Sequence, residues 1–320
     1  MVAHWLAELD GSSVVVEVPA SSANLGAGYD CLGVALAMTN RIELEVRVWS
    51  RGEIELTVDG EGRDELTEDR ENRFVRGLEA ALRMAHGELP GEVGWRIGMR
   101  NQIPLSRGLG SSAAATVGGV LAGNSLTGEP LSTSELLRLA TQIEEHPDNA
   151  AAVLLGGFVV SASTPEGVEA IRFDAPRDLR AVLFIPDLRL STRAMRAALP
   201  ASVPLADAVA NLSAVAVGVA GLATGRLELL GRLTVDRLHE PYRAMVYPQL
   251  PAMVAAAREA GALGACLSGA GSTIIAFTDS TAGAAALERA LTVAAAEAEL
   301  TGRVRTVELR NAGAQVVVRA

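Results

Sequence analysis

Alternating apolar and polar residues predict strands in both halves of the chain. Over residues 14–18, valines and a glutamate alternate in a way that predicts a strand ending at Pro19, with a loop over 20–30 after it. Further runs, either alternating or wholly apolar, predict the other strands. These runs cover residues 41–48, 53–58, 95–99, 151–161, 180–185, 263–267, 273–277 and 303–309.

Apolar residues spaced three and four apart predict helices between these strands. Phe74, Leu78 and Leu82, for example, share one side of a helix. Ser132 and Glu135 fit a capping box, which predicts a helix beginning there and ending near Glu145. The predicted helices cover residues 72–86, 111–124, 132–145, 191–199, 205–224, 228–233, 250–260 and 282–299.

The order of these elements predicts an α+β protein with two domains. A chain of 320 residues is long enough for two hydrophobic cores. The second half has a βαββαβ-like order, which is typical of a ferredoxin-like layer of helices on an antiparallel sheet. The turn-forming triplet at 165–167 interrupts the pattern. We therefore expect one domain over residues 1–165 and a second over 166–320.

Composition and charge narrow the class of protein. The net charge of −10 argues against a nucleic-acid or anionic-membrane surface, so we expect no nucleic acid and no membrane among the partners. The apolar run 205–223 contains Asp207 and Asn211, so it is interpreted as a buried helix. No signal peptide is visible, and Cys31 and Cys266 lack metal-ligand spacing. These features favour a cytoplasmic protein with reduced thiols.

The segment Pro104–Ala115, PLSRGLGSSAAA, has the composition of a phosphate-binding loop. Its two glycines allow the backbone to approach an anion closely, and Ser111 and Ser112 stand where a helix would begin. A helix N-terminus offers unpaired N–H groups and a partial positive charge, which suit a polyphosphate. The predicted nucleotide contacts here are Pro104, Leu105, Ser106, Arg107, Gly108, Leu109, Gly110, Ser111, Ser112, Ala113 and Ala114.

This loop differs from a standard P-loop, which requires a lysine after its last glycine. The chain contains no lysine, and all its basic side chains except histidine are arginine. Backbone amides, arginine and a metal ion must therefore neutralise a bound nucleotide. The loop also fits the dinucleotide fingerprint G-x-G-x-x-A, but that motif directly follows a strand. Here residues 101–107 separate the glycines from the strand predicted at 95–99.

Three blocks in a fixed order carry a resemblance to the GHMP small-molecule kinases. They are PASSANLGAGYDCLG at 19–33, the loop at 104–115, and LSGAGST at 267–273. Within this superfamily the chain resembles the homoserine kinases, and the resemblance extends over nearly its whole length. The distinguishing segments are SANLG at 22–26, EEHPDN at 144–149, LSTRAMR at 190–196 and EPYR at 240–243.

The resemblance implies a specific fold and activity. It implies the two-domain GHMP kinase fold, with a ribosomal-protein-S5-like N-terminal domain and a ferredoxin-like C-terminal domain. The implied reaction uses ATP to phosphorylate the side-chain hydroxyl of L-homoserine in threonine biosynthesis, and a homodimer is expected. Three departures from the family pattern, Ala27, Tyr29 and Glu145, remove no catalytic group.

Homoserine carries a carboxylate, an ammonium and a primary hydroxyl, and each needs a partner. Arg196 and Arg243 can hold the carboxylate in bidentate geometry, and the resemblance favours this over ordinary surface arginines. By resemblance, Asp30 accepts from the ammonium or the hydroxyl. The remaining substrate contacts implied by the resemblance are Asn24, His146, Asn149 and Thr192. Each has a structural alternative, as a turn former, at a helix end fixed by a proline, or as a helix cap.

The resemblance also assigns the metal and the catalytic groups. Ser112 and Glu144 are the expected Mg²⁺ ligands, and with Asp30 they are the expected catalytic residues. Since the chain lacks lysine, we expect catalysis by alignment, Mg²⁺ and the helix N-terminus, without a dedicated base. Further nucleotide contacts are expected at Asn72, which could instead cap a helix, and at Ser268, Gly269 and Gly271.

Three other functions compete with this prediction. Another GHMP kinase would act on a mevalonate-like or sugar substrate. A non-catalytic sensor would keep the fold and bind nucleotide or amino acid without turnover. A nicotinamide-dependent oxidoreductase would use the dinucleotide fingerprint.

Overall fold

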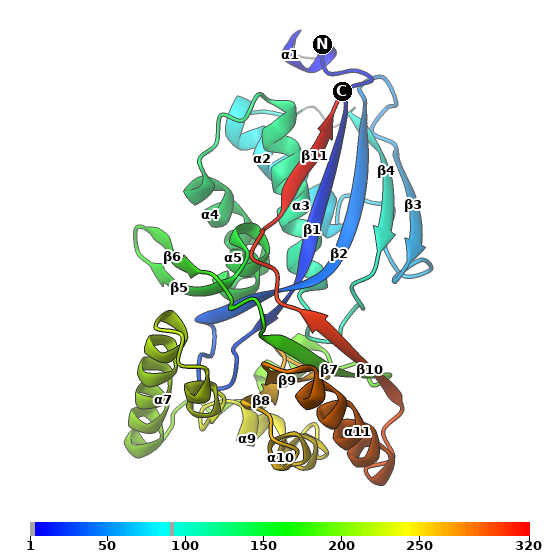
Figure 1. Cartoon of the computed structure of the whole chain (residues 1–320). Helices are drawn as coiled ribbons and strands as arrows, with labels where there is room; N and C mark the ends of the chain where they lie inside the picture. Colours follow the sequence, from blue (N-terminus) through cyan, green and yellow to red (C-terminus); the bar gives the residue numbers. More distant parts are fainter. Residues whose placement is uncertain (1–3, 90–92) are drawn as a thin grey trace.

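The computed structural model describes residues 4–89 and 93–320, so residues 1–3 and 90–92 of the expected first domain lie outside the described residues. It contains a seven-stranded and a four-stranded sheet, each covered by helices (Figure 1). The strands are β1 Ser13–Ala23, β2 Leu32–Arg47, β3 Ile54–Gly60, β4 Gly94–Asn101, β5 Phe158–Thr164, β6 Gly167–Phe173, β7 Arg180–Pro186, β8 Gly264–Leu267, β9 Ile274–Thr278, β10 Gly302–Glu308 and β11 Gln315–Arg319.

The helices stand between these strands along the chain, some singly and some in succession. They are α1 His4–Ala7, α2 Arg73–His86, α3 Ser111–Leu126, α4 Thr133–Glu144, α5 Pro147–Leu155, α6 Thr192–Ala197, α7 Leu205–Ala223, the 3₁₀ turn η1 Leu227–Leu229, α8 Leu230–Leu233, α9 Glu240–Arg243, α10 Leu250–Glu259 and α11 Thr281–Glu297. The capping box of Ser132 and Glu135 is present at the start of α4.

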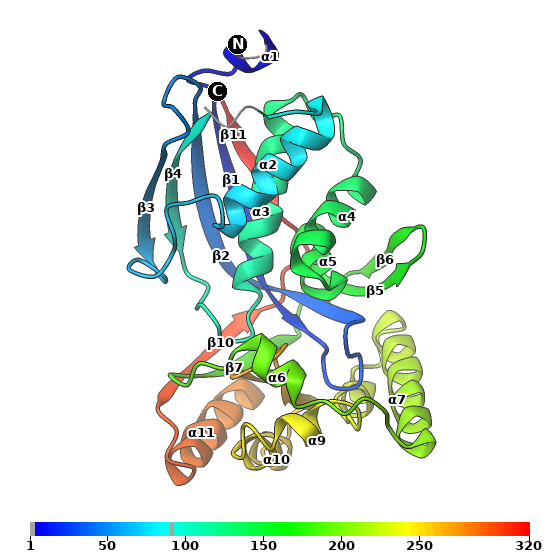
Figure 2. The same ribbon diagram turned by 180° about the vertical axis from the view of Figure 1, so that it is seen from behind.

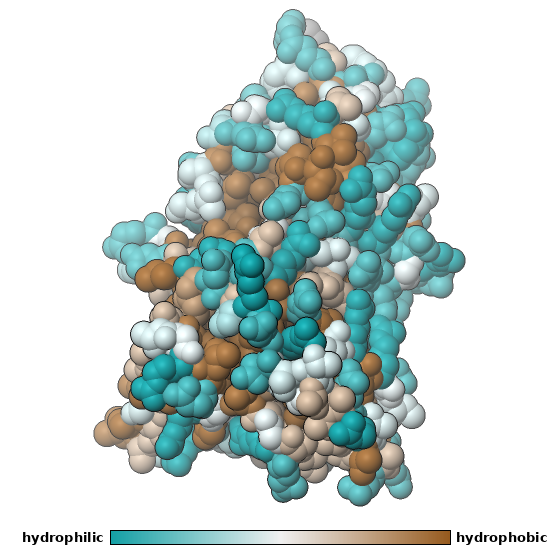
Figure 3. All heavy atoms as spheres, viewed as in Figure 1, coloured by the Kyte–Doolittle hydropathy of each residue, from teal (hydrophilic) through white to brown (hydrophobic). Residues whose placement is uncertain are grey.

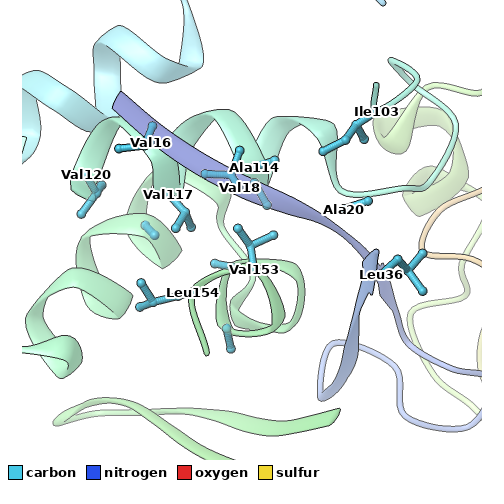
Figure 4. Close-up of a cluster of buried hydrophobic side chains, with 14 of the residues drawn as sticks. Val16, Val18, Ala20, Leu36, Ile103, Ala114, Val117, Val120, Val153 and Leu154 are labelled. Atoms are coloured by element: carbon cyan, nitrogen blue, oxygen red, sulfur yellow. The ribbon is translucent and has the colours of Figure 1, made fainter. Parts of the chain in front are cut away.

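The seven-stranded sheet follows the order β11-β1-β2-β4-β3, and β5 joins β2 and carries β6. Helices α2 to α5 lie in front of it when the molecule is seen from behind (Figure 2). The small residues of α3 pack against β1, and Val117 and Val120 face Val16 and Val18 with Val153 of α5 close by (Figure 4). Burial of this apolar surface is the main force that holds α3, and therefore its N-terminus, in place.

The four-stranded sheet has the order β10-β7-β9-β8, and all its neighbouring strands are antiparallel. Numbered along the chain, this is the order 4-1-3-2 with α10 and α11 packed on the sheet, as expected for a ferredoxin-like arrangement. Its own core includes Met253, Leu287 and Leu291, which are buried. The predicted ferredoxin-like half is therefore confirmed.

The chain crosses between the two sheets after residue 173 and again near its end. The expected division at 165/166 falls in the turn between β5 and β6, which pair with each other in the seven-stranded sheet. Near the C-terminus, Leu309 bridges to Leu36, and β11 then pairs with β1. We therefore propose the division within residues 174–179, with β11 completing the first domain.

Three predicted elements differ from the structure in their bounds or their type. The strand expected at 41–48 is the second part of β2, which begins at Leu32. β1 does not end at Pro19 but continues to Ala23, because a register shift after Pro19 lets the strand bend and keep its pairing with β2. The apolar run at 151–161 is not one strand: α5 ends at Leu155, and β5 begins at Phe158. A short, wholly apolar run has the same periodicity in a buried helix and a buried strand.

Helix α7 is more exposed than the sequence predicts. We expected a buried helix, but Leu205 is 80% and Leu212 is 71% exposed. Among the described helices, it alone has the length and apolar composition that a membrane span requires, and core helices of soluble proteins meet the same criterion. Figure 3 shows apolar residues toward this side of the molecule, while polar residues cover the side of β3 and β4.

Candidate active site

A cavity of about 620 Å³ lies where both halves of the chain meet. It brings together most of the residues singled out in the sequence. Those in its wall are Asn24, Asp30, Pro104, Ser106, Arg107, Gly108, Leu109, Gly110, Ser111, Ser112, Ala113, Glu144, His146, Asn149, Thr192, Arg196 and Arg243. Ala114 is fully buried in the core, and Asn72 and Leu105 line a neighbouring cavity.

The phosphate-type loop connects β4 to α3. β4 ends at Asn101 and α3 begins at Ser111, so nine residues intervene, too many for the direct strand-to-helix turn of a dinucleotide fingerprint. Gly110 is the N-cap residue of α3, and no side chain caps the helix. The first N–H groups of this 16-residue helix therefore face the cavity without a protein acceptor from a capping side chain.

Glycine is required at two positions of this loop. Gly108 has φ +74°, and a Cβ atom there would lie 2.1 Å from the carbonyl oxygen of Ser268. Gly110 has φ +69°, and its Cβ would lie 2.0 Å from Ser21 Oγ. Any side chain would meet these atoms and strain the backbone, so the loop packs closely against β1 and the segment after β8.

The third block, LSGAGST, supports the loop from behind. Ser268 Oγ lies 2.6 Å from the Gly108 carbonyl oxygen and 2.8 Å from Ser22 Oγ. The N–H of Thr273 donates to the Arg107 carbonyl at 3.1 Å. Ser268, Gly269 and Gly271 are buried outside the wall of the large cavity. In place of the expected nucleotide contact, we propose that they brace the loop.

Arg107 ties the loop to the second sheet. Its Nε donates to the carbonyl of Pro186 at 2.7 Å, and Nη2 donates to that of Asp187 at 2.8 Å. Both acceptors lie at the end of β7. The guanidinium thus holds the two halves together beside the cavity.

Ser112 and Glu144 form a hydrogen-bonded pair at one end of the cavity. Ser112 Oγ donates to Glu144 Oε1 at 2.8 Å, and Thr116 Oγ1 donates to the same oxygen at 2.6 Å. Arg73 Nη1 lies 3.7 Å from it. The described residues contain no cluster of three or more His, Cys, Asp or Glu suited to a metal. This pair of oxygen ligands fits a hard cation such as Mg²⁺, which binds few protein groups and completes its shell with phosphate and water.

The other end of the cavity is occupied by paired charges. Arg196 Nη2 donates to Asp30 Oδ1 at 2.6 Å, and Nη1 donates to Oδ2 at 3.0 Å. Arg196 Nη1 also contacts the hydroxyl of Tyr29. Both charged side chains are about one-third exposed. The two residues predicted to bind opposite ends of an amino acid are therefore bonded to each other.

Arg243 lies deeper and is only 1% exposed. Its Nη1 donates to the carbonyl of Gly269 at 2.9 Å, and Asn24 Nδ2 donates to the same oxygen at 2.9 Å. The guanidinium carbon lies 5.3 Å from the centre of the Tyr29 ring. Burial lowers the pKa of Arg243, and the nearby charge of Arg196 contributes a smaller lowering. The guanidinium still stays charged near neutral pH.

Asp148 is a residue of this site that the sequence analysis missed. It is 3% exposed, lines the cavity, and accepts from the N–H of Asn149 at 2.7 Å. Burial, followed by repulsion from Asp30, raises the pKa of Asp148 to about 7. Asp148 stands in the segment EEHPDN, whose neighbouring polar residues were singled out in its place.

The remaining predicted residues divide between cavity wall and helix ends. His146 is the N-cap residue of α5 and is half-buried, and burial and Arg196 lower its pKa. Asn149 accepts from Ser21 Oγ at 2.8 Å. Asn72 caps α2 by accepting from the N–H of Phe74 at 3.0 Å, so the capping alternative is confirmed. Ser191 caps α6, which leaves Thr192 in the cavity wall.

A second cavity of about 310 Å³ adjoins the first at Ser111 and Ser112. Leu66, Met99 and Leu105 give it an apolar wall. Asn101 is also in this wall; its Nδ2 donates to the Glu61 carbonyl at 3.1 Å, and its buried Oδ1 has no hydrogen-bond partner among the described residues. The combined space extends from an apolar end, past the loop, to a charged end.

Comparison with known proteins places these features in a family. The description "GHMP kinases N terminal domain" matches residues 72–157, and "GHMP kinases C terminal" matches residues 219–296. A homoserine kinase of Moorella thermoacetica is 46% identical over 82% of this chain and 86% of its own length. A homoserine kinase of Parasynechococcus marenigrum is 40% identical over 95% of both chains.

Solved structures agree with these sequence matches. The crystal structure of homoserine kinase from Cytophaga hutchinsonii has a TM-score of 0.84 and 30% identity, and it covers 95% of this chain and 97% of that one. A mevalonate kinase from L. major, at 16% identity and a TM-score of 0.64, shares the fold over 95% of this chain.

Proposed function

The chain belongs to the homoserine kinases of the GHMP kinase family, and we propose that its two adjoining cavities hold ATP and L-homoserine end to end. The protein is a kinase that transfers phosphate from ATP to the side-chain hydroxyl of homoserine, a reaction of threonine biosynthesis. One observation carries the proposed placement: the loop, the Ser112–Glu144 pair and the charged cluster converge on one space.

We place the triphosphate along the loop at residues 108–113. The uncapped N-terminus of α3 offers N–H groups and a partial positive charge, and Arg73 stands beside the same end of the cavity. No lysine is required, because the backbone and this arginine supply the positive field. The apolar cavity beside Ser111 fits the base.

Homoserine would bind at the charged end. Its carboxylate suits the guanidinium groups of Arg243 and Arg196, which can donate in pairs. Its ammonium suits Asp30 and the buried Asp148, which lacks an ion-pair partner among the described residues. The zwitterion would thus replace the internal ion pair of Arg196 and Asp30 with two new ion pairs. Its carboxylate would pair with Arg196 and its ammonium with Asp30.

Ser112 and Glu144 would hold Mg²⁺ at the boundary between the two substrates. When bound, the ion would supply positive charge beside the phosphates. The donor set supports this, since both groups present oxygen and Glu144 already sits within 2.8 Å of the serine hydroxyl. The magnesium ion remains part of the proposal.

We propose that alignment, without a dedicated base, carries the reaction. Asp30 accepts from Arg196 through both of its oxygens, so it serves to bind and orient in this arrangement. Phosphoryl transfer passes through a loose transition state, in which positioning and charge stabilisation supply most of the rate. The fixed amides of the loop and of α3 remain in place as charge develops on the transferred phosphoryl group.

An ADP-release assay over homoserine, mevalonate and galactose tests this assignment. We expect turnover with homoserine and MgATP to exceed turnover with the other acceptors by orders of magnitude. A preference for mevalonate or a sugar would favour another GHMP kinase activity. Ligand-dependent melting without ADP release would favour a sensor, and stabilisation by NAD would favour an oxidoreductase.

The cellular setting is also proposed. We propose a cytoplasmic enzyme that needs neither nucleic acid nor membrane, which the net charge of −10 supports. We further propose a homodimer, because α7 exposes Leu205, Val209 and Leu212 together on its outer side. Light scattering on the purified protein would give the number of copies.

A further inference from the structure

A fully buried histidine stands directly behind the substrate-binding arginine. His239 is 0% exposed and precedes α9, which ends at Arg243. Asp236 fixes this turn by accepting from the N–H groups of His239 at 2.8 Å and Glu240 at 2.7 Å. The backbone of His239 is therefore held by Asp236 and does not depend on the imidazole ring. The ring nitrogens can form hydrogen bonds with other groups.

The two ring nitrogens of His239 have different partners. Nδ1 lies 3.1 Å from Arg243 Nη1, and because arginine only donates, Nδ1 must accept. Nε2 lies 2.7 Å from the carbonyl oxygen of Gly26, which only accepts, so Nε2 must carry the proton. These contacts specify the neutral ring in one tautomer.

Other charges around the ring agree with this state. Asp236 Oδ2 lies 3.8 Å from Nε2, Arg243 faces Nδ1, and Asp30 is the remaining charged group that acts on the ring. Burial lowers the pKa of His239 to about 4, against the opposing attraction of Asp236. The ring is therefore neutral over the working range of a cytoplasmic enzyme.

The hydrogen bonds of Arg243 leave one edge of its guanidinium without a partner among the described residues. Nη1 is fully used by His239 and the carbonyl of Gly269. Nε is buried and has no partner among the described residues, and no described group accepts from Nη2. The Nε–Nη2 edge is one of the two faces through which arginine binds a carboxylate in bidentate fashion.

We infer that His239 is a positioning residue that orients Arg243, so that the Nε–Nη2 edge meets the carboxylate of homoserine. By donating to Gly26, the same ring links Arg243 to the loop that carries Asn24 and Asp30. This inference rests on the proposed function, in which Arg243 binds the substrate carboxylate. It adds a group that touches no substrate but fixes one that does.

Two conservative variants separate the roles of the two nitrogens. Asparagine can place an oxygen near the position of Nδ1, whereas glutamine can place an amide near the position of Nε2. We expect His239→Gln to raise the KM for homoserine roughly ten- to hundredfold, because a hydrogen bond to a charged group is lost. His239→Asn should stay within about threefold of the wild type, and the KM for ATP should not change in either variant.

A double-mutant cycle with Arg243→Ala decides whether His239 acts through Arg243. In that background, His239→Gln should change the KM for homoserine less than about twofold. The same effect in both backgrounds, equal losses in the Asn and Gln variants, or a parallel rise in the KM for ATP would each overturn the inference. A normal homoserine KM for Arg243→Ala alone would instead refute the proposed site, and the two failures are thus distinguishable.

Nitrogen NMR of the wild-type protein tests the inference even where a variant does not fold. The His239 imidazole should show a proton on Nε2, and adding homoserine should shift its Nδ1 resonance more than adding an ATP analogue does. A proton on Nδ1 would contradict the positioning role of His239. So would a Nδ1 resonance that shifts only when the nucleotide analogue is added.

Discussion

The two ends of the active-site cavity are built in different ways. At the nucleotide end, the backbone of one continuous segment lies against β1 and the block after β8, and its glycines leave no room for side chains. At the amino-acid end, charged side chains arrive from separate parts of the sequence, and Arg196 and Asp30 already bond each other. In the proposed function, the first end is ready for its ligand, whereas the second must exchange internal partners for the substrate.

If the proposed placement holds, this difference between the two ends has a consequence for the binding of phosphate and of the amino acid. A preformed backbone cradle loses little freedom when phosphate binds, so binding there has a small ordering cost. At the other end, the zwitterion must compete with an ion pair that is already made, and specificity then depends on satisfying both charges at once. A substrate with only a carboxylate or only an ammonium would leave one protein charge unpaired.

Removing the charge of Glu144 should have the largest effect. We expect Glu144→Gln to lower kcat/KM for ATP roughly 10²- to 10³-fold, the range found when one preorganised electrostatic group is lost. Glu145→Gln, at the exposed neighbouring position, is the matched control and should change activity less than about threefold. Equal losses in the two variants would remove Glu144 from its proposed role.

Breaking the internal ion pair tests the amino-acid end alone. Arg196→Ala should raise the KM for homoserine roughly 30- to 100-fold, because Arg196 and Asp30 are both expected to change partners when substrate binds. The KM for ATP should stay constant. The pair is one-third exposed, so the unfolding free energy should change by less than about 1 kcal/mol.

Steady-state kinetics with both substrates varied gives the two constants in one data set. Arg193→Ala, which removes a neighbouring cavity-lining arginine that has no proposed substrate contact, is the control. A rise in both KM values would mean that the two ends are not separate in the way described.

The buried Asp148 predicts a pH dependence of stability. Its pKa is about 7 in the folded protein and near its ordinary value when unfolded, so the folded state holds an extra proton between about pH 4 and 7. The unfolding free energy therefore falls as pH rises through this range, and the loss is complete above pH 7.

Asp148→Asn removes this dependence. Between pH 5 and pH 8, the unfolding free energy of the wild type should fall by about 2 kcal/mol more than that of the variant. Urea unfolding at the two pH values measures the difference. An identical difference between the proteins at both pH values would show that Asp148 ionises normally.

Ser268→Ala should have the smallest effect, and it should fall on the nucleotide end. Loss of the hydroxyl contacts with Gly108 and Ser22 loosens the loop, so we expect the KM for ATP to rise about three- to tenfold. The homoserine KM should be unchanged. A reversed pattern, with homoserine affected and ATP not, would contradict the bracing role.

The proposed nucleotide end could be predicted from the sequence, because one continuous segment of the chain forms it. The glycines, serines and other small residues of 104–115 predict a tight loop and a helix packed closely on a sheet. Both are present in the structure. The capping box at Ser132 and the ferredoxin-like order were also predicted, since each depends on short-range spacing. These features need no knowledge of distant partners.

The proposed amino-acid end could be predicted only in part, because its side chains come from distant parts of the sequence and contact one another only in the fold. Sequence alone could name Arg196 and Asp30, but not that they pair. Asp148 and His239 do not stand out in the sequence, because their burial and their contacts are made by distant parts of the fold. Likewise, β11 returns to the first sheet from the end of the chain, and the local turn signal at 165–167 carries no information about that pairing, which underlies the division we propose at 174–179.

A crystal structure with a non-hydrolysable ATP analogue and homoserine tests the central claim most directly. It should place the triphosphate against the amides of residues 108–113 and the homoserine carboxylate on Arg243 and Arg196, with the Arg196–Asp30 pair opened. Nucleotide density elsewhere, beside an empty loop and an intact Arg196–Asp30 pair, would contradict the account.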